Sequence, residues 1–290
     1  MRPPPTWPAR QAGVALLLVL WACTLLAILL GGYAALARTE GLQARYQFAE
    51  THAHYAAEAG LMLAFYKLQD PRPRHRWNGD GQVYTFRYDD ATVKVSAINE
   101  GGKVDLNVAT PEVLLGLFKA AGVGAPQAQA LAKNVVDWRS APDPASGAAG
   151  ADSAYRAAGR SYGPRHGPFS SIEELQMVLG MTPAIYRKVA PAVTVWSGSQ
   201  TPDPTVAPPL ALAAIPGMTA QRQHAIQAAR LVDANNPSLV LSNGTTHSIE
   251  SEATLADGTS ATVRATIRAQ PGQAGAQPYA VLRWQEGKGE

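Results

Sequence analysis

The sequence predicts an α+β protein in which a long N-terminal helix packs on an antiparallel β-sheet, and a large helical insertion domain interrupts that sheet. Three observations predict this fold class. An uncharged apolar run near the N-terminus continues without a proline into an amphipathic stretch that ends near residue 70. Alternating apolar and polar residues, typical of half-buried strands, follow this stretch and return near the C-terminus. Between them, apolar residues recur at spacings of three and four, which are typical of helices.

Composition narrows the classes of function. The chain has 290 residues, and 25 Lys and Arg against 22 Asp and Glu give a formal charge of +3. This excess is too small to indicate a nucleic-acid or anionic-membrane partner by itself. The only cysteine, Cys23, lies inside the apolar run, so an intramolecular disulfide is excluded.

The first element is a membrane-spanning helix predicted over residues 14–37, which contain no charged side chain. At about 1.5 Å per residue this run reaches roughly 36 Å, enough to cross a hydrocarbon core of about 30 Å. Arg2 and Arg10 precede the run and no positive charge follows before Arg38, so the N-terminus is predicted to be cytoplasmic and the rest to face the periplasm or the outside. Cleavage after the signal-like sequence Ala-Leu-Ala at 35–37 is the alternative.

Residues 38–70 are predicted to continue the same helix as an amphipathic rod. Their apolar and small residues recur at spacings of three and four, and Asp70-Pro71 ends the pattern because proline lacks an amide donor. The residues of this face are Leu42, Tyr46, Ala49, Ala53, Ala56, Gly60, Ala64 and Leu68. Alanine and glycine on this face allow close packing against the soluble domain.

The sheet is predicted in two parts, residues 82–104 and 236–290. In the first part, two alternating runs flank Asp89-Asp90, which indicates a β-hairpin. In the second part the predicted strands are 246–256, 260–269 and 278–285, with "ADGTS" (256–260) as a hairpin turn.

The helical insertion is predicted over residues 105–235. Thr110-Pro111 and Thr182-Pro183 each supply an N-cap followed by proline at the first helical position. Ser171, followed by Glu174 three residues later, fits a capping box, and a further helix is predicted from 219 to 231. The turns "AGVG", "VLGM" and "IPGM" resemble helix-hairpin-helix turns, whose glycine amides can bind DNA phosphates.

The N-terminal region resembles type IV pilin-like proteins. The resemblance rests on a short basic leader (residues 1–13) that ends in Gly13, the apolar helix directly after it, and "AEAGLMLAFYKL" at 57–68. It implies a pilin-like fold, cleavage after Gly13 by a prepilin peptidase, and N-methylation of Val14. Major members of the family carry glutamate at the fifth mature position, where it neutralises the amine of a neighbour during assembly; Leu18 stands there in this chain.

Five ordered stretches resemble one branch of these proteins, the K-type minor pseudopilins of the type II secretion system. They are "INEGGKVDLNVATPEVL" (98–114), "DWRS" (137–140), "GADSAY" (150–155), "PFSSIEELQMVLGMTPAIYRKVAPAVTV" (168–195) and "PYAVLRW" (278–284). The resemblance implies a structural protein, not an enzyme, that sits at the tip of a pseudopilus and initiates or caps its assembly for protein export. Its implied location is the bacterial inner membrane, crossed once, with the C-terminal domain in the periplasm. Its implied partners are other minor pseudopilins and the prepilin peptidase.

A calcium site is predicted in the Gly/Pro-rich stretch 137–168, which is expected to have no regular structure. Asp137, Asp143 and Asp152 supply oxygen ligands that a hard cation prefers, and the resemblance also implies calcium in this part of the chain. The family usually has an acidic residue at the position of Ser140 and glutamate at that of Asp152, so one ligand is missing. The alternative is a solvated acidic loop.

The rival function is a membrane-anchored DNA receptor that uses the helix-hairpin-helix turns. Charge argues against nucleic acid, because residues 104–195 hold eight Lys or Arg and seven Asp or Glu, whereas phosphate binding usually requires a clear basic excess. No phosphate loop or nucleophile motif occurs. His52 and His54 point to different faces of their helix, which makes zinc binding improbable without distant partners.

Overall fold

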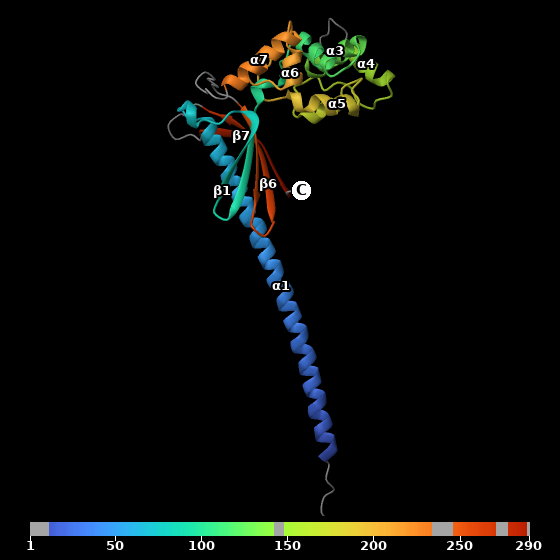
Figure 1. The fold of residues 1–290 in the computed structure, drawn as a ribbon. Coiled ribbons are helices and arrows are strands. Elements are labelled where there is room, and N and C mark those ends of the chain that lie inside the picture. The colour runs from blue at the N-terminus through green and yellow to red at the C-terminus, as the bar shows by residue number, and fades with distance from the viewer. Residues whose placement is uncertain (1–11, 142–147, 234–245, 271–277, 289–290) are drawn as a thin grey trace, which may run out of the picture.

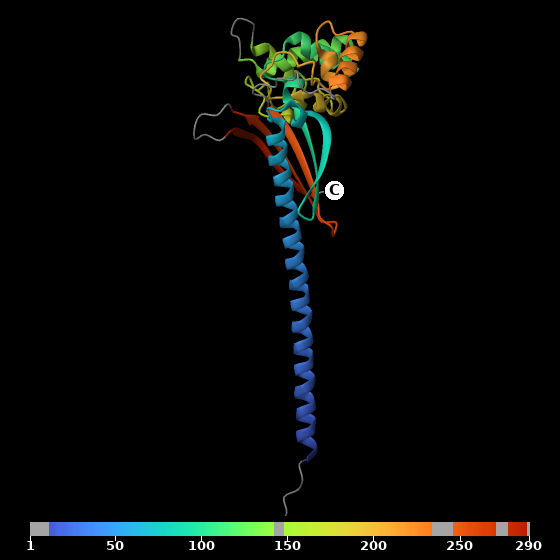
Figure 2. The ribbon, with the colours of Figure 1, turned by 60° about the vertical axis from the view of Figure 1, so that its left-hand side comes forward.

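The longest element of the computed structural model is helix α1 (Ala12–Leu68), which has 57 residues (Figure 1). The structure describes residues 12–141, 148–233, 246–270 and 278–288. At about 1.5 Å per residue, α1 is roughly 85 Å long. Its side chains from 14 to 48 are exposed, and its first half projects away from the rest of the molecule (Figures 1 and 2). This helix is long and apolar enough to cross a membrane.

Five antiparallel strands form one sheet in the order β1-β2-β5-β6-β7. The order places β2 beside β5, with Asn99 opposite His247, although every described α-helix after α1 lies between them in sequence. The hairpin predicted around Asp89-Asp90 is confirmed, and Tyr88 pairs with Ala91 across its turn. The strands are β1 (Asp80–Tyr88), β2 (Ala91–Asn99), β5 (Thr246–Thr254), β6 (Ser260–Ala269) and β7 (Tyr279–Lys288).

The second half of α1 packs on one face of this sheet through small residues. Ala53, Ala57 and Ala64 are fully buried, as is Leu61. At Gly60 the helix lies so near the strands that an added Cβ would be 2.6 Å from the Val93 side chain and would also meet the hydroxyl of Ser251. The predicted close packing is therefore confirmed for the face from Ala53 onwards, whereas Leu42 and Tyr46, predicted on the same face, are 60% and 55% exposed.

A lobe of short helices lies on the end of the sheet that is remote from the apolar half of α1 (Figure 1). Its α-helices are α2 (Pro111–Ala120), α3 (Ala125–Arg139), α4 (Ala148–Ala157), α5 (Pro183–Val189), α6 (Pro209–Ala214) and α7 (Ala220–Asp233). The parallel pair β3 (Val104–Asp105) and β4 (Val193–Thr194) ties the start of the lobe to its later part. The 3-10 turns of the chain are η1 (Pro73–His75), η2 (Glu100–Gly102), η3 (Ile172–Met177) and η4 (Ala190–Ala192).

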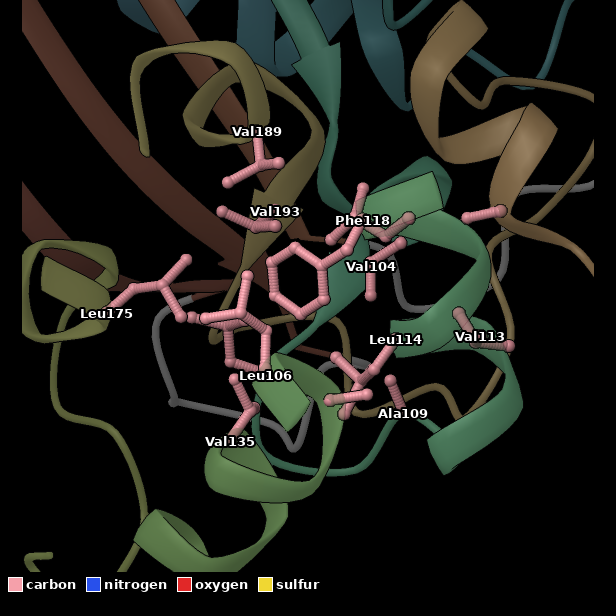
Figure 3. Packing of buried hydrophobic residues seen from close by; sticks show 14 of the residues in the cluster. Val104, Leu106, Ala109, Val113, Leu114, Phe118, Val135, Leu175, Val189 and Val193 are labelled. Atoms are coloured by element: carbon pink, nitrogen blue, oxygen red, sulfur yellow. The ribbon is translucent and has the colours of Figure 1, made fainter. Parts of the chain in front are cut away.

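The lobe has a hydrophobic core of its own, separate from the core between α1 and the sheet. Phe118 lies at its centre, close to Leu106 and Leu114, and strands β3 and β4 add Val104 and Val193 (Figure 3). Because each of these side chains is buried, the lobe is stabilised mainly by removal of apolar surface from water.

Two of the predicted helix caps are confirmed, because Thr110 Oγ1 accepts from Val113 N and Thr182 Oγ1 accepts from Ile185 N. The capping box at Ser171 is wrong. Ser171 makes no capping hydrogen bond, and Glu174 instead accepts from the backbone N–H and the hydroxyl of Ser170. The segment forms a 3-10 turn rather than an α-helix, and this geometry brings the preceding serine within reach.

The expectation of no regular structure between 137 and 168 is also wrong, because α4 occupies part of that stretch. Alanines at five of its ten positions favour a helix. Tyr155 fixes the helix to the lobe, since its ring is buried and its hydroxyl accepts a hydrogen bond from Leu179 N at 2.9 Å.

Candidate functional site

The predicted processing and assembly residues lie at the free end of α1. Gly13 and Val14 are in its first turn, and Leu18 follows one turn later. The side chains of Val14 and Leu18 are each 63% exposed. Both therefore lie on a part of the helix that no other described element covers.

The structure brings two of the three predicted calcium ligands onto neighbouring helices. Asp137 is on the last turn of α3 and Asp152 is on α4, while Asp143 lies outside the described residues. The rings of Trp138 and Tyr155, whose centroids are 6.2 Å apart, join the two helices. Burial raises the pKa of the Tyr155 hydroxyl, and the nearby Asp137 carboxylate adds to that shift.

Each of these two carboxylates already faces a nitrogen group. Asp137 Oδ2 lies 2.5 Å from Lys133 Nζ, and Asp152 Oδ1 lies 3.6 Å from His166 Nε2. His166 Nδ1 lies 3.1 Å from the backbone oxygen of Ser140, whereas its buried Nε2 makes no hydrogen bond to any residue that the structure describes. Calcium prefers six to eight oxygen ligands, so the described residues fit this ion only in part.

The buried carboxylate of Asp105, at the base of the lobe, was not predicted from the sequence. Asp105 is 1% exposed and accepts hydrogen bonds from three donors of the lobe: Asn107 N at 2.8 Å, Gly198 N at 2.7 Å and Ser197 Oγ at 3.2 Å. A single aspartate at the end of a two-residue strand carries no periodic signal, and two of its partners lie more than ninety positions later. Asp105 thus holds the segment after β4 against the start of the lobe.

Arg139 reinforces the same region from the end of α3. Its guanidinium donates to the backbone oxygens of Leu106 at 2.7 Å and Ala109 at 2.6 Å. Burial lowers the pKa of Arg139, and the charge of Asp105 opposes that shift. The "DWRS" stretch therefore contains a structural arginine that ties α3 to the residues before α2.

Side chains of β6 and β7 attach the lobe to the sheet. Arg268 Nη2 donates to the backbone oxygen of Trp196 at 2.8 Å, and its Nε donates to Thr246 Oγ1 at 3.0 Å. Arg283 Nη2 lies 3.3 Å from Glu173 Oε1. These contacts link the lobe to the sheet, so they help to set the position of the lobe at the distal end.

The three glycine turns connect helices of the lobe. Gly122, Gly180 and Gly217 have positive φ angles of 83°, 84° and 74°, a conformation that glycine adopts without strain. The first turn is also tied to α5, since Lys188 Nζ donates to the Ala121 oxygen at 3.2 Å. No finding supports the DNA-binding alternative.

Comparison with known proteins gives one family and one fold. Residues 94–198 match the family model described as type II secretion system (T2SS), protein K. A search of curated protein sequences gives no match. Among solved structures, the chain is similar to one from the GspK-GspI-GspJ complex of the enterotoxigenic Escherichia coli type 2 secretion system, with a TM-score of 0.55 and 17% sequence identity. The similarity covers 87% of this chain and 100% of that chain, and it shows a shared fold.

Proposed function

We propose that this chain is a minor pseudopilin that forms the tip of the pseudopilus and initiates or caps its assembly. The match of residues 94–198 to the family model of protein K of the type II secretion system supports this proposal. The observation that carries this proposal is the position of the helical lobe at the end of the sheet remote from the apolar half of α1 (Figure 1). In a fibre whose subunits share the direction of α1, that end faces the next subunit above. A bulky lobe there hinders stacking of a further subunit, which suits a terminal position. The proposed role is structural and not enzymatic.

A deletion tests whether the lobe acts as a cap. Asn99 and His247 are opposite each other on neighbouring strands, so a short turn can replace the lobe without moving either strand. We expect the variant that lacks residues 105–235 to permit longer pseudopili in a cell that overproduces the major subunit. If the variant is folded and present in the membrane but fibre length is unchanged, the proposal that the lobe caps the fibre is refuted.

The N-terminal apolar helix fits a single-pass membrane anchor. We place that anchor in the bacterial inner membrane with the N-terminus in the cytoplasm and the soluble domain in the periplasm. Arg2 and Arg10 before the apolar run support this orientation. A reporter enzyme active only in the periplasm should be active when fused after residue 290 and inactive when fused before residue 1.

We also propose that a prepilin peptidase cleaves the chain after Gly13 and that Val14 is then N-methylated. Mass spectrometry of the mature N-terminus, after co-expression with the peptidase, tests this step. A methylated Val14 is the expected result. A chain that starts at Arg38 would mean release as a soluble secreted protein and would contradict assembly through α1.

Leu18, at the opposite end of the molecule from the lobe, gives a second argument for a position at the tip of the pseudopilus. A glutamate at this place serves contact with the amine of a neighbouring subunit, and leucine offers no carboxylate for that contact. A tip subunit has no subunit above it and does not need the charge. If tip assembly is unchanged in Leu18→Glu, the missing charge is not decisive for the tip position.

The proposed partners are the other minor pseudopilins of the same secretion system. The similar solved chain comes from a complex named for GspK, GspI and GspJ, which supports this choice. The full chain should co-purify with its cognate minor pseudopilins from detergent-solubilised membranes. Co-purification with none of them would contradict the proposal.

Calcium binding by Asp137, Asp143 and Asp152 is a further part of the proposal. Two of these carboxylates lie on neighbouring helices, and a bound calcium ion would supply charge that holds the acidic groups together. A ligand specific for the folded state raises the unfolding temperature. An unchanged unfolding temperature of the full chain in excess calcium therefore counts against this site.

A further inference from the structure

His52, on the second half of α1, lies between the two carboxylates of the β1–β2 turn. Its Nε2 is 3.6 Å from Asp89 Oδ2, and its Nδ1 is 3.5 Å from Asp90 Oδ1. The three residues can each offer one ligand atom within 4.8 Å of the others. Asp89 and Asp90 are thus the further ligands, distant in sequence, that His52 would need to bind a metal ion.

The spacing of these atoms is that of metal ligands and not that of direct hydrogen bonds. N–H···O hydrogen bonds are typically about 2.7–3.2 Å long, so neither ring nitrogen is within ordinary reach of its carboxylate. In a tetrahedral site with bonds of about 2.0–2.1 Å, two ligand atoms are roughly 3.4 Å apart. The separation of 3.6 Å between Nε2 and Asp89 Oδ2 is close to this value, as is that of 3.5 Å between Nδ1 and Asp90 Oδ1, so either ring nitrogen can share an ion with the carboxylate that it faces.

The surroundings leave room for an ion and its water. A cavity of about 540 Å³ is lined by His52 and Asp90, and also by Arg45 and Asp257 as charged neighbours. The side chain of His52 is 30% exposed, and those of Asp89 and Asp90 are 75% and 57% exposed. An ion can therefore enter from solvent without a change in the fold.

We infer that His52, Asp89 and Asp90 form a binding site for a divalent transition-metal ion such as zinc, which joins α1 to the first hairpin of the sheet. One imidazole nitrogen binds the ion together with carboxylate oxygens, and water completes the coordination. The other ring nitrogen then faces the second carboxylate, and that exposed side chain can move closer to accept its hydrogen bond, an arrangement that fixes the orientation of a metal-binding histidine. Imidazole suits zinc, copper and nickel, whereas calcium prefers oxygen alone, so this site differs in chemistry from the predicted calcium loop.

His54 provides a matched control on the same helix. It lies two residues away on another face, with Nε2 3.4 Å from Glu58 Oε1 and 3.9 Å from Glu286 Oε1. Among the described residues, the three-ligand group is formed by His52 and not by His54. Removing His54 therefore deletes an imidazole beside carboxylates without touching the proposed ligands.

The test is a zinc titration of the full chain in detergent micelles, without a histidine tag, followed by calorimetry and thermal unfolding. We expect one zinc ion per chain and a raised unfolding temperature for the natural sequence and for His54→Ala. In His52→Ala, zinc affinity should fall at least about tenfold, the scale seen when groups of a metal site are removed. The pair Asp89→Asn and Asp90→Asn, which keeps side-chain size, should give the same loss if His52→Ala does not fold.

Three results would overturn the inference. They are no zinc binding by the natural sequence, undiminished zinc binding in the variants of His52 or of the two aspartates, and equal loss of binding in His54→Ala. None of these results depends on whether the chain occupies the tip of a pseudopilus, so the proposed function is tested separately.

Discussion

Substitution of Gly60 tests how closely α1 packs on the sheet. An added Cβ would lie 2.6 Å from Val93 Cγ1 and 3.1 Å from Val95 Cγ2, and it would also meet the Ser251 hydroxyl. Contacts below about 3.0 Å require a neighbour to move, and these neighbours belong to two central strands of the sheet. The strands must therefore shift, or the helix must rise from the sheet.

Two opposing effects set the size of the change. Replacing glycine by alanine in a helix interior stabilises it by about 0.5–1 kcal/mol. Overpacking a close-packed core costs about 1–3 kcal/mol. We expect Gly60→Ala to lower the free energy of unfolding by up to about 2 kcal/mol, and Gly60→Val to lower it further because its two methyl groups enlarge the clash.

The assay is denaturant unfolding of the full chain in detergent, followed by tryptophan fluorescence, with Gly41 as the control. Gly41 is also inside α1, but a Cβ there meets nothing within 4 Å. Gly41→Ala and Gly41→Val should therefore change stability only through helix propensity. If the two series give the same changes in free energy, the steric argument for Gly60 is refuted.

Three further predictions concern charged groups. Asp105→Ala leaves three donors without their acceptor, so we expect the free energy of unfolding to fall by about 2–4 kcal/mol. A denaturant titration measures this change, and a change below about 0.5 kcal/mol would contradict the structural role of Asp105. Hydrogen bonds from Arg72 hold the pKa of Asp70 well below its ordinary value. The ionised Asp70 carboxylate therefore stabilises the folded state fully at a pH above the unperturbed pKa of about 3.9, and this stabilisation is lost as the pH falls. Asp70→Asn should therefore lower the unfolding temperature at neutral pH and reduce its decline in acid, and parallel pH profiles of the two proteins would refute this. Arg283→Ala removes an exposed ion pair with Glu173 and should change stability by less than about 1 kcal/mol, as a double-mutant cycle with Glu173→Ala can measure.

The local elements could be predicted because their signals lie within a few residues of one another. The course of α1 follows from an unbroken apolar and amphipathic pattern, and Asp70-Pro71 explains its end. The caps at Thr110 and Thr182 depend on hydrogen bonds three residues long, so sequence spacing is sufficient to find them. The alternation on either side of Asp89 likewise determined the first hairpin.

Only the tertiary structure decided which distant residues meet. The pairing of Asn99 with His247, the donors that surround Asp105 and the approach of His52 to the β1–β2 turn all join positions far apart in the chain. Side-chain periodicity specifies which face of an element is buried, but it does not specify the neighbour that covers it. That choice depends on how the two cores pack, because the chain passes through the helical lobe between β2 and β5. The sequence by itself therefore determined most of the elements and their buried faces, although it missed α4 and the 3-10 turn after Ser171, whereas packing determined their partners and the candidate metal site.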